Sequence, residues 1–392
     1  MVYPGAIDRV VGKPAPKVGD IVYVCNGAEE PFAWGVYNSE SLYRVRIMEV
    51  CGDVDRERAS QPSLDALVVD RIQSAYALRC LLKLPSKDTT VYRLVNSEGD
   101  GLSGLIVDVL GENLVVIQSS AAWVERQREM IQAAIKLVLQ RETLDIVWRR
   151  SKDILREEGL SEEESGSSKT LVDHEDANGE TIVLEHGVQY HVDPLGQKTG
   201  FYADQKEHRK FIQDRAHGMD VLDLCCYTGG FALNAAAGGA KSVVGVDSSA
   251  AAIEMAKNNA VLNKTVSCEF HQASITNYMR EATEEGKKWD IIILDPPKLA
   301  PNKKSLTRAL RKYESLNAAA LRLVRPGGLL MTCSCSGAVA QGQAFLPMLQ
   351  KAARRAGRKI TLLRNGGAAP DHPLHLGYPE GQYLTNVTLR VS

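Results

Sequence analysis

The stretch from Val221 to Gly230, which reads Val-Leu-Asp-Leu-Cys-Cys-Tyr-Thr-Gly-Gly, most constrains what this chain can fold into. It predicts a short apolar strand with a carboxylate, Asp223, near its end, followed by a turn that opens a helix at Phe231. A ligand bound at the carboxyl end of a parallel strand needs close backbone approach, exposed amide donors and a helix N-terminus. On its own, a glycine pair after a strand equally fits a tight turn without a ligand.

Two further apolar segments lead into an aspartate. Val243–Val246 precedes Asp247, about 20 residues downstream, where doubly wound folds place the carboxylate that binds ribose hydroxyls. The alternative for Asp247 is a cap on a helix expected over 249–262. Ile291–Leu294 runs into Asp295-Pro296-Pro297-Lys298, a motif that a dinucleotide-dependent oxidoreductase has no reason to carry.

Together these motifs resemble the class I S-adenosylmethionine-dependent methyltransferases. In nucleic-acid enzymes of that class, the fourth strand ends in an acid or amide and a proline pair beside the methyl donor and the target base. The family's first motif is commonly acid-x-Gly-x-Gly-x-Gly, whereas this chain has Asp223, Cys225, Tyr227 and Gly229 at those positions. The loop ending Tyr-Thr-Gly-Gly-Phe fits one branch of the class. The resemblance implies an α/β, Rossmann-like methyltransferase domain over residues 194–392.

The C-terminal half alternates apolar and amphipathic segments, which predicts a parallel sheet covered on both faces. Expected strands are 221–225, 242–247, 266–271, 290–294, 328–333, 359–364 and 383–391, and expected helices are 231–237, 249–262, 304–323 and 340–356. No helix follows the last strand. In line with the resemblance, we expect that strand at an antiparallel edge of the sheet.

The cofactor implied by the resemblance is S-adenosylmethionine. Asp223 and the region of Asp204 are expected near its amino acid part, and Asp247 is expected to bind both ribose hydroxyls. Where the family often has an acid for the adenine amino group, this chain has Ser274. The residues implied to bind the cofactor are Phe201, Asp204, Gln205, Arg209, Asp223, Cys225, Gly229, Asp247, Ser248, Ser274 and Asp295.

Several of these residues come from the segment Gln197–Arg209, which contains Lys-Thr-Gly-Phe-Tyr-Ala-Asp-Gln. It closely resembles a family loop that lies over the methionine end of the cofactor. As structure alone, the segment also fits a helix entrance with a charged face. No metal site is expected, since the eight cysteines show neither a Cys-x-x-Cys pair nor zinc spacing.

The segment Gly327–Gly337 is an apolar strand running into Ser-Cys-Ser-Gly. Carbon 5 of a pyrimidine is a poor nucleophile, so enzymes that methylate it first add a cysteine thiolate to carbon 6. The Ser-Cys-Ser resembles the nucleophile motif of bacterial large-subunit ribosomal RNA cytosine-5 methyltransferases that carry a PUA domain. Cys335 is the implied nucleophile. Cys333 is the rival, because residues two apart on a strand share a face.

Two residues of the Asp-Pro-Pro-Lys motif complete the expected catalytic set. Asp295 is expected to hydrogen-bond the cytosine edge at N3 or N4, and Lys298 to contact phosphate or to lower the pKa of the thiolate. Amine methyltransferases carry an aromatic residue where Lys298 stands, which favours methylation at carbon. The residue that accepts the carbon 5 proton is not identified.

The N-terminal half predicts two smaller domains. Residues 1–60 read as short strands and turns and resemble a PUA domain, an RNA-binding pseudobarrel, through Tyr3–Ile7 and Val18–Asp20. The match begins late, so the domain is expected to be truncated or altered at its RNA edge. An OB- or SH3-like structural barrel is the alternative. Residues 61–193 predict a central α+β domain of strand-strand-helix-strand-strand type.

Composition limits the partners and the location. The net charge is −1, so RNA must be bound by local basic patches. The scattered cysteines favour a reducing compartment, and no segment is apolar for the length of a membrane span. We expect a cytoplasmic protein, or a plastid or mitochondrial one if a transit peptide precedes Met1. The basic residues after the Asp-Pro-Pro motif are Lys298, Lys303, Lys304, Arg308, Arg311 and Lys312.

The resemblance implies methylation of carbon 5 of a cytosine in large-subunit ribosomal RNA, with the target base flipped out of its stack. A uracil-5 methyltransferase and a catalytically silent RNA-binding factor that retains the fold are the alternatives. A homodimer is an assembly that the sequence leaves open.

Overall fold

The computed structural model describes residues 1–50, 62–160, 170–173, 181–194, 200–300 and 302–392. The chain forms two compact units, each described here by itself. Unit 1 comprises residues 1–181, 192–201 and 371–375, and unit 2 comprises residues 182–191, 202–370 and 376–392. The first three residues of the segment Gln197–Arg209 lie outside the described residues.

Unit 2 is built on a seven-stranded sheet in the order β13-β12-β11-β14-β15-β17-β16. Its strands are β11 (Asp220–Leu224), β12 (Ser242–Asp247), β13 (Cys268–Gln272), β14 (Trp289–Leu294), β15 (Val324–Ser334), β16 (Ile360–Gly366) and β17 (Thr385–Val391). The first five strands run parallel, so their carboxyl ends meet at one edge of the sheet. The strand order reverses between β11 and β14, which is where open α/β sheets bind their ligands.

One expectation about this sheet was wrong. β17 is antiparallel to β15 as expected, but it lies between β15 and β16, and β16 is the edge strand. β17 is therefore flanked on both sides and is mostly buried.

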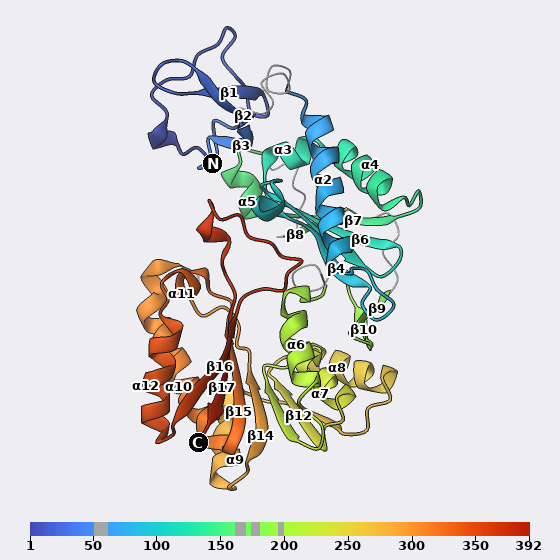
Figure 1. Cartoon of the computed structure of the whole chain (residues 1–392), viewed down its shortest axis with the longest axis vertical. Coiled ribbons are helices and arrows are strands. Elements are labelled where there is room, and N and C mark those ends of the chain that lie inside the picture. The colour runs from blue at the N-terminus through green and yellow to red at the C-terminus, as the bar shows by residue number, and fades with distance from the viewer. Residues whose placement is uncertain (51–61, 161–169, 174–180, 195–199, 301) are drawn as a thin grey trace. The chain divides into compact units, whose positions relative to one another are not determined.

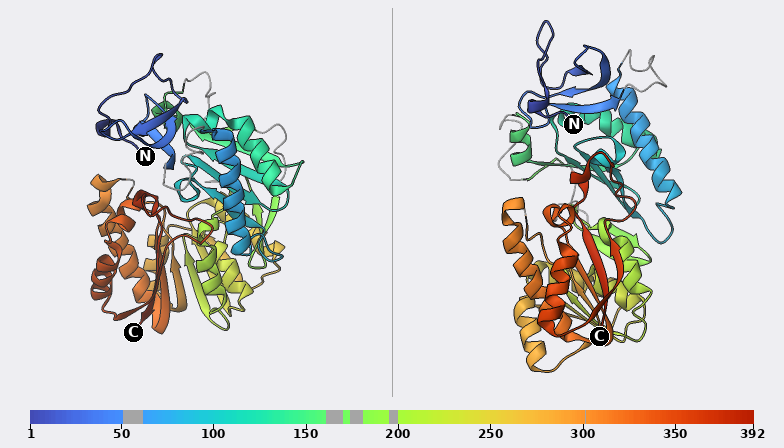
Figure 2. Two further views of the ribbon diagram at one scale, coloured as in Figure 1. Left: turned by 45° about the horizontal axis from the view of Figure 1, so that its top comes forward. Right: turned by 60° about the vertical axis from the view of Figure 1, so that its left-hand side comes forward.

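Helices cover both faces of this sheet (Figures 1 and 2). The helices are α6 (Lys206–Gln213), α7 (Gly230–Ala237), α8 (Ala250–Leu262), α9 (Ile275–Glu284), α10 (Leu306–Leu323), α11 (Gly337–Gln341) and α12 (Phe345–Ala356), with short 3-10 turns η4 (Ala203–Gln205), η5 (Lys303–Ser305) and η6 (Pro379–Gly381). α7 and α8 contact β11–β13, whereas α10 contacts β14, β15 and α12. Since central strands are covered on both faces, Ile291–Leu294 is a continuous buried apolar run.

A two-stranded hairpin, β9 (Thr181–Glu185) and β10 (Val188–Val192), lies outside the large sheet. The predicted central domain, residues 61–193, includes this hairpin, whereas in the structure residues 182–191 belong to unit 2. Side chains at the end of α8 explain this: Asn263 accepts from the Gln189 amide at 2.8 Å, and Asn259 accepts from the His191 amide at 2.8 Å.

Unit 1 contains a three-stranded and a five-stranded sheet. The elements are β1 (Ile21–Cys25), β2 (Pro31–Tyr37), β3 (Val45–Val50), α2 (Leu64–Leu81), β4 (Val91–Asn96), β5 (Leu105–Leu110), β6 (Leu114–Ser119), α3 (Ala122–Arg126), α4 (Arg128–Leu139), β7 (Asp145–Ser151), α5 (Lys152–Glu157) and β8 (Thr170–Asp173), with 3-10 turns η1 (Pro4–Ala6) and η2 (Ser97–Asp100). Trp34 and Met48 from the first sheet share one apolar core with α2 and β4–β6.

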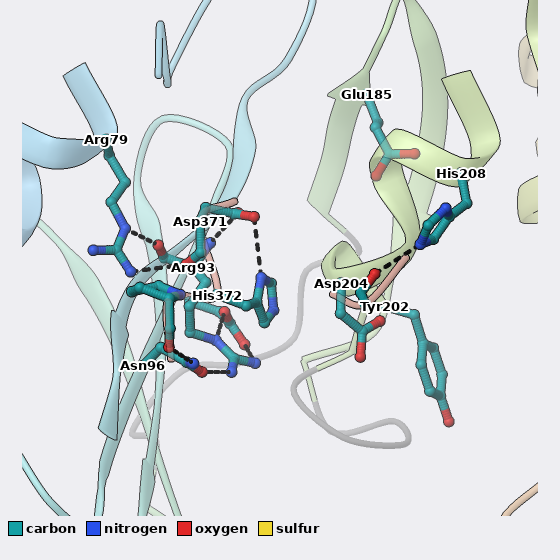
Figure 3. A network of polar contacts seen from close by, with 12 residues as sticks. Arg79, Arg93, Asn96, Glu185, Tyr202, Asp204, His208, Asp371 and His372 are labelled. Atoms are coloured by element: carbon teal, nitrogen blue, oxygen red, sulfur yellow. Dashed lines mark hydrogen bonds and ion pairs between the residues drawn. The ribbon is translucent and has the colours of Figure 1, made fainter. Parts of the chain in front are cut away.

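Unit 1 also receives the segment Asp371–His375, which lies between β16 and β17 in the sequence. Figure 3 shows Asp371 beside Arg79 and Arg93. Arg79 is fully buried, forms an ion pair with Asp100 at 2.5 Å and donates to the Asp371 carbonyl at 2.8 Å. The Asp371 carboxylate accepts from the Arg93 amide at 3.0 Å. This short segment therefore supplies acceptors to buried donors of unit 1.

Candidate active site

The loop after β11 keeps a backbone that normally requires glycine. Cys225, Tyr227 and Gly229 all have positive φ, at 66°, 49° and 87°. These are the three positions that the family motif gives to glycine, and two of them carry side chains here. The left-handed conformation costs a non-glycine residue about 1–2 kcal/mol. At Gly229 a side chain would add a second strain to the backbone one, because its Cβ atom would lie 3.2 Å from the Phe270 ring, which would have to shift.

Asp223 is fully buried on β11. Its Oδ2 accepts from the Ala232 amide of α7 at 3.0 Å, whereas Oδ1 has no hydrogen-bond partner among the described residues. Burial raises the pKa of this carboxyl to about 8, and the charges of Asp295 and Asp247 add to the shift. A buried carboxylate oxygen without a donor fits a ligand that brings a cationic amine, as the amino acid part of S-adenosylmethionine does.

Asp247 lies at the end of β12, half-buried. Its Oδ2 accepts from the Tyr227 amide at 3.0 Å and its Oδ1 from the Ser249 amide at 2.9 Å. Each carboxylate oxygen keeps a second lone pair, so these bonds are compatible with two ligand hydroxyls. The alternative role as a helix cap belongs instead to Ser249, whose hydroxyl accepts from the Ala252 amide at the start of α8.

The two serines expected at the cofactor are exposed. Ser248 follows Asp247 directly. Ser274 precedes α9, and its side chain makes no capping hydrogen bond. A hydroxyl at either position is accessible to a ligand, and their contacts with the cofactor stay predictions.

The segment before β11 reaches several parts of unit 2. Asp204 accepts from the Tyr383 hydroxyl at 2.7 Å, and the Gln205 amide donates to Asp295 Oδ2 at 3.1 Å. Figure 3 shows Tyr202, Asp204 and His208 on this segment and its helix. Phe201 is buried and belongs to unit 1. Gln205 therefore contacts a proposed catalytic carboxylate directly.

Arg209 has a structural role that the sequence does not predict. Its guanidinium forms a buried two-bond ion pair with Glu185 of β9, at 2.5 and 2.6 Å, and donates to the Tyr202 carbonyl at 2.7 Å. Burial acts to lower the pKa of Arg209, but the partner charge of Glu185 outweighs it and raises the pKa above its ordinary value. Arg209 thereby fixes the Tyr202 backbone to the hairpin, and its contact with the cofactor stays a prediction.

The two cysteines of β15 have opposite environments. Parallel pairing sets Leu294 opposite Thr332, so Asp295 and Cys333 follow at neighbouring ends of β14 and β15. Cys333 is fully buried, and its sulfur accepts from the Asn386 amide at 3.1 Å. Burial raises the Cys333 pKa well above its ordinary value. Cys335, just beyond the strand end, is only half-buried.

Tyr202 lies among the site residues although sequence reasoning missed it. Its ring contacts Tyr227 edge-on, with centroids 5.2 Å apart. Burial raises its pKa most, and the charges of Tyr227, Asp204, Cys335 and Asp295 raise it further. The ring contact places Tyr202 beside the loop after β11. The aromatic run in Gly-Phe-Tyr was the signal available in the sequence.

A basic surface follows the Asp-Pro-Pro motif. Lys298 is exposed on the loop after β14. Lys304, Arg308, Arg311 and Lys312 are exposed on η5 and the first turns of α10, and Lys303 begins η5. Among the described residues, no cluster of His, Cys, Asp and Glu could hold a metal ion. In the part of the chain that the structure describes, no helix is long and apolar enough to span a bilayer.

Comparisons with known proteins agree with this geometry. Residues 102–373 match the S-adenosylmethionine-dependent methyltransferase family, and residues 1–49 match a PUA-like domain. Solved structures with the same fold include a protein of Streptococcus mutans described as a SAM-dependent methyltransferase, with TM-score 0.76, 21% identity and coverage of 95% of this chain and 91% of that one. Another is a methyltransferase complexed with SAH, with TM-score 0.76, 22% identity and the same coverage.

Curated relatives match over nearly the full length. The ribosomal RNA large subunit methyltransferase I of Tolumonas auensis is 36% identical, with 99% of this chain and 94% of the relative covered. The protein of the same name from Photobacterium profundum is 34% identical, with 98% and 93% covered. The chain therefore belongs to the S-adenosylmethionine-dependent methyltransferases, in the family of ribosomal RNA large subunit methyltransferase I, and its cofactor is S-adenosylmethionine.

Proposed function

We propose that the protein methylates carbon 5 of a cytosine in large-subunit ribosomal RNA through a covalent adduct with Cys335. The names of the full-length relatives support the RNA class. The observation that carries the covalent mechanism is the contrast on β15: Cys333 is sealed and hydrogen-bonded, whereas Cys335 is half-buried beyond the strand end. An attacking sulfur must reach a ring, and the greater exposure of Cys335 supports this position over Cys333.

The chain's residues divide the chemistry as follows. The Cys335 thiolate adds to carbon 6, forming a carbon–sulfur bond and making carbon 5 electron-rich. Bound S-adenosylmethionine supplies an electrophilic methyl group for carbon 5 and leaves as S-adenosylhomocysteine. Loss of the carbon 5 proton to a base then restores the double bond and expels the Cys335 thiolate. The enzyme is thereby regenerated.

Asp295 is the proposed reader of the base. A carboxylate accepts from the exocyclic amine of cytosine, whereas uracil presents a carbonyl at the same place. The Gln205 amide donates to one Asp295 oxygen at 3.1 Å, which limits how the carboxylate can rotate. A carboxylate fixed in place as an acceptor favours the amine of cytosine over the carbonyl of uracil. Lys298 is exposed and follows Asp295 closely in the sequence. It is proposed to contact phosphate or to lower the pKa of the Cys335 thiol.

Three carboxylates and a serine are proposed to bind the polar groups of the cofactor. Asp223, whose Oδ1 lacks a donor among the described residues, is proposed to hold the amino group together with Asp204. Asp247 is proposed to bind the ribose hydroxyls through the lone pairs that the Tyr227 and Ser249 amides leave open. Ser274 is proposed to accept from the adenine amine.

The basic residues after β14 are proposed to follow the RNA phosphates, with affinity that falls as salt rises. They lie on the segment that joins the tip of β14 to α10 and on the first turns of α10, after Asp295 in the sequence. The PUA-like domain at residues 1–49 is proposed as a second RNA contact. A homodimer and a cytoplasmic location stay predictions.

The first test compares Cys335→Ala with Cys333→Ala. We expect Cys335→Ala to lower turnover by more than about a thousandfold, because the nucleophile is lost, with cofactor affinity kept within about twofold. Cys333→Ala is the matched control on the same strand and should keep most activity. RNA containing 5-fluorocytosine should trap a denaturant-resistant adduct with the wild type, since fluorine cannot leave as a cation. Full activity of Cys335→Ala would end the covalent proposal.

The second test identifies the base. Bisulfite sequencing of large-subunit ribosomal RNA from cells with and without the gene should show one cytosine that loses methylation. An unchanged profile with loss of methylated uracil would favour the uracil-5 alternative. Calorimetry with S-adenosylmethionine separates an enzyme from a silent RNA-binding factor, because the latter has no need to bind the cofactor.

A further inference from the structure

The tip of β15 is tied to α10 by a chain of buried hydroxyl groups. The Tyr313 hydroxyl, on α10, lies 3.0 Å from Ser334 Oγ and 3.3 Å from Ser336 Oγ. Ser336 Oγ also accepts from the Ala300 amide at 3.2 Å, and Ser334 Oγ accepts from the Ser336 amide at 3.3 Å. All three hydroxyl-bearing residues are fully buried.

The directions of these hydrogen bonds fit together. Ser334 receives an amide proton and donates its own hydroxyl proton to Tyr313. With its oxygen taken by the Ser334 proton, the Tyr313 hydroxyl is free to donate to Ser336, although either oxygen of that pair can be the donor, and the Ser336 oxygen also accepts from the Ala300 amide. The Tyr313 hydroxyl thus joins α10, the end of β15 and the loop that begins at Asp295.

This chain bears on Cys335 through its two neighbours. Successive side chains of an extended segment point to opposite sides. Ser334 and Ser336 are both bonded to Tyr313, and Ser336 is extended with φ −101° and ψ 109°. Cys335 stands between them, so this alternation predicts that its side chain is directed away from α10, on the side opposite its two bonded neighbours.

We propose that Tyr313 is a positioning residue for the methyl transfer, which sets Cys335 and the Asp295–Ala300 loop in one geometry for attack on the base. The proposal rests on the covalent mechanism above and deepens it. Tyr313 touches neither ligand nor reacting atom. Its hydroxyl bonds the side chains of the serines on either side of the nucleophile, and Ser336 Oγ in turn accepts from the Ala300 amide of the base-reading loop.

The decisive variant is Tyr313→Phe. It keeps the aromatic ring, which packs edge-on against Phe345 at 5.7 Å, and removes the hydroxyl. We expect kcat to fall by at least about tenfold, since small displacements of a reacting group are costly, with the KM for S-adenosylmethionine changed less than about twofold. The rate of adduct formation with 5-fluorocytosine RNA should fall by the same factor as kcat.

A matched control is Tyr92→Phe in unit 1. Tyr92 is equally buried, and its hydroxyl has no hydrogen-bond partner among the described residues. Its loss should leave kcat unchanged. Ser336→Ala, which leaves the tyrosine in place but breaks the link to Ala300, should lower kcat in the same direction and covers the case in which Tyr313→Phe folds poorly.

These variants separate an error in the positioning role of Tyr313 from an error in the covalent mechanism. If Cys335→Ala is inactive while Tyr313→Phe and Ser336→Ala keep wild-type kcat and adduct rates, the positioning role is wrong and the covalent mechanism stands. If Cys335→Ala keeps full activity, the covalent mechanism itself is wrong. A lower melting temperature of Tyr313→Phe with unchanged kcat per folded molecule would also overturn the proposal, because it describes a purely structural hydroxyl.

Discussion

The tips of β11 and β15 end the same parallel sheet but are built in opposite ways. After β11, Cys225 and Tyr227 hold positive φ, and Asp223 keeps a buried oxygen without a partner among the described residues. At the end of β15, none of the residues Ser334–Ser336 has positive φ, and both serine hydroxyls are hydrogen-bonded. The first tip leaves a buried carboxylate oxygen unsatisfied, whereas the two serine hydroxyls beside Cys335 at the second are hydrogen-bonded.

Under the proposed function, this difference separates a tip that binds the cofactor from a tip that holds the nucleophile in place. Unsatisfied buried groups are costly until a ligand arrives, so they favour binding. Satisfied groups favour a fixed geometry, which suits a nucleophile. Changes at the first tip should therefore alter cofactor binding, and changes at the second should alter the chemical step.

The largest effect at the first tip is expected for Asp223→Asn. Loss of a carboxyl that can ionise against the cofactor's amino group should weaken S-adenosylmethionine binding by about ten- to a hundredfold, because a hydrogen bond to a charged group contributes about 1.5–3 kcal/mol. Isothermal titration calorimetry measures this directly. Asp220→Asn is the control, since Asp220 begins the same strand and bonds Ser242 and Arg325 instead.

Equal affinities in the two asparagine variants would remove the distinction between the tips. An Asp223→Asn variant that binds the cofactor normally but transfers no methyl group would move Asp223 from binding to chemistry.

A second prediction concerns pH. The pKa of Asp223 is about 8 in the fold, against an ordinary value of 3.8 for an aspartate. At a pH between these two values, the Asp223 carboxyl is protonated in the folded state and ionised in the unfolded state. The free energy of unfolding should therefore fall as pH rises from about 4 to 8, by up to about 1.4 kcal/mol per unit from this group alone. Urea unfolding of wild type and Asp223→Asn between pH 5 and pH 9 isolates the effect.

The asparagine variant lacks this proton, so the stability of the wild type relative to it should decline with pH and level off above about 8. Parallel stability curves for the two proteins would mean that Asp223 is charged in the fold throughout.

The smallest effect is expected at Cys225. Cys225→Gly relieves the left-handed backbone but adds freedom to the unfolded chain, so stability should change by less than about 1 kcal/mol. Cys225→Val places a β-branched residue at φ 66° and should destabilise by about 2 kcal/mol or more. Thermal unfolding of both variants tests whether the strain resides in the backbone. An equal loss of stability in Cys225→Gly and Cys225→Val would show that packing of the thiol matters instead.

Motifs contained within one strand and its turn were predictable from the sequence. The family and the α/β architecture are confirmed, because an apolar run, an acid and turn residues lie within a few positions of each other. Contacts between distant segments were not predictable: Tyr383 with Asp204, Gln205 with Asp295 and Glu185 with Arg209 depend on packing. The position of β17 inside the sheet was not predictable either, since Thr385–Val391 alternates polar and apolar residues as an edge strand would.

The chain passes between its two units after residues 181, 191, 201, 370 and 375. No single cut can therefore release two self-sufficient pieces. A fragment ending near residue 193 would lack the Asp371 carbonyl that accepts from Arg79, and the complementary fragment would lack the hairpin whose Glu185 neutralises Arg209. Modular exchange of unit 1 with that of a relative would have to transplant the five-residue segment 371–375 as well.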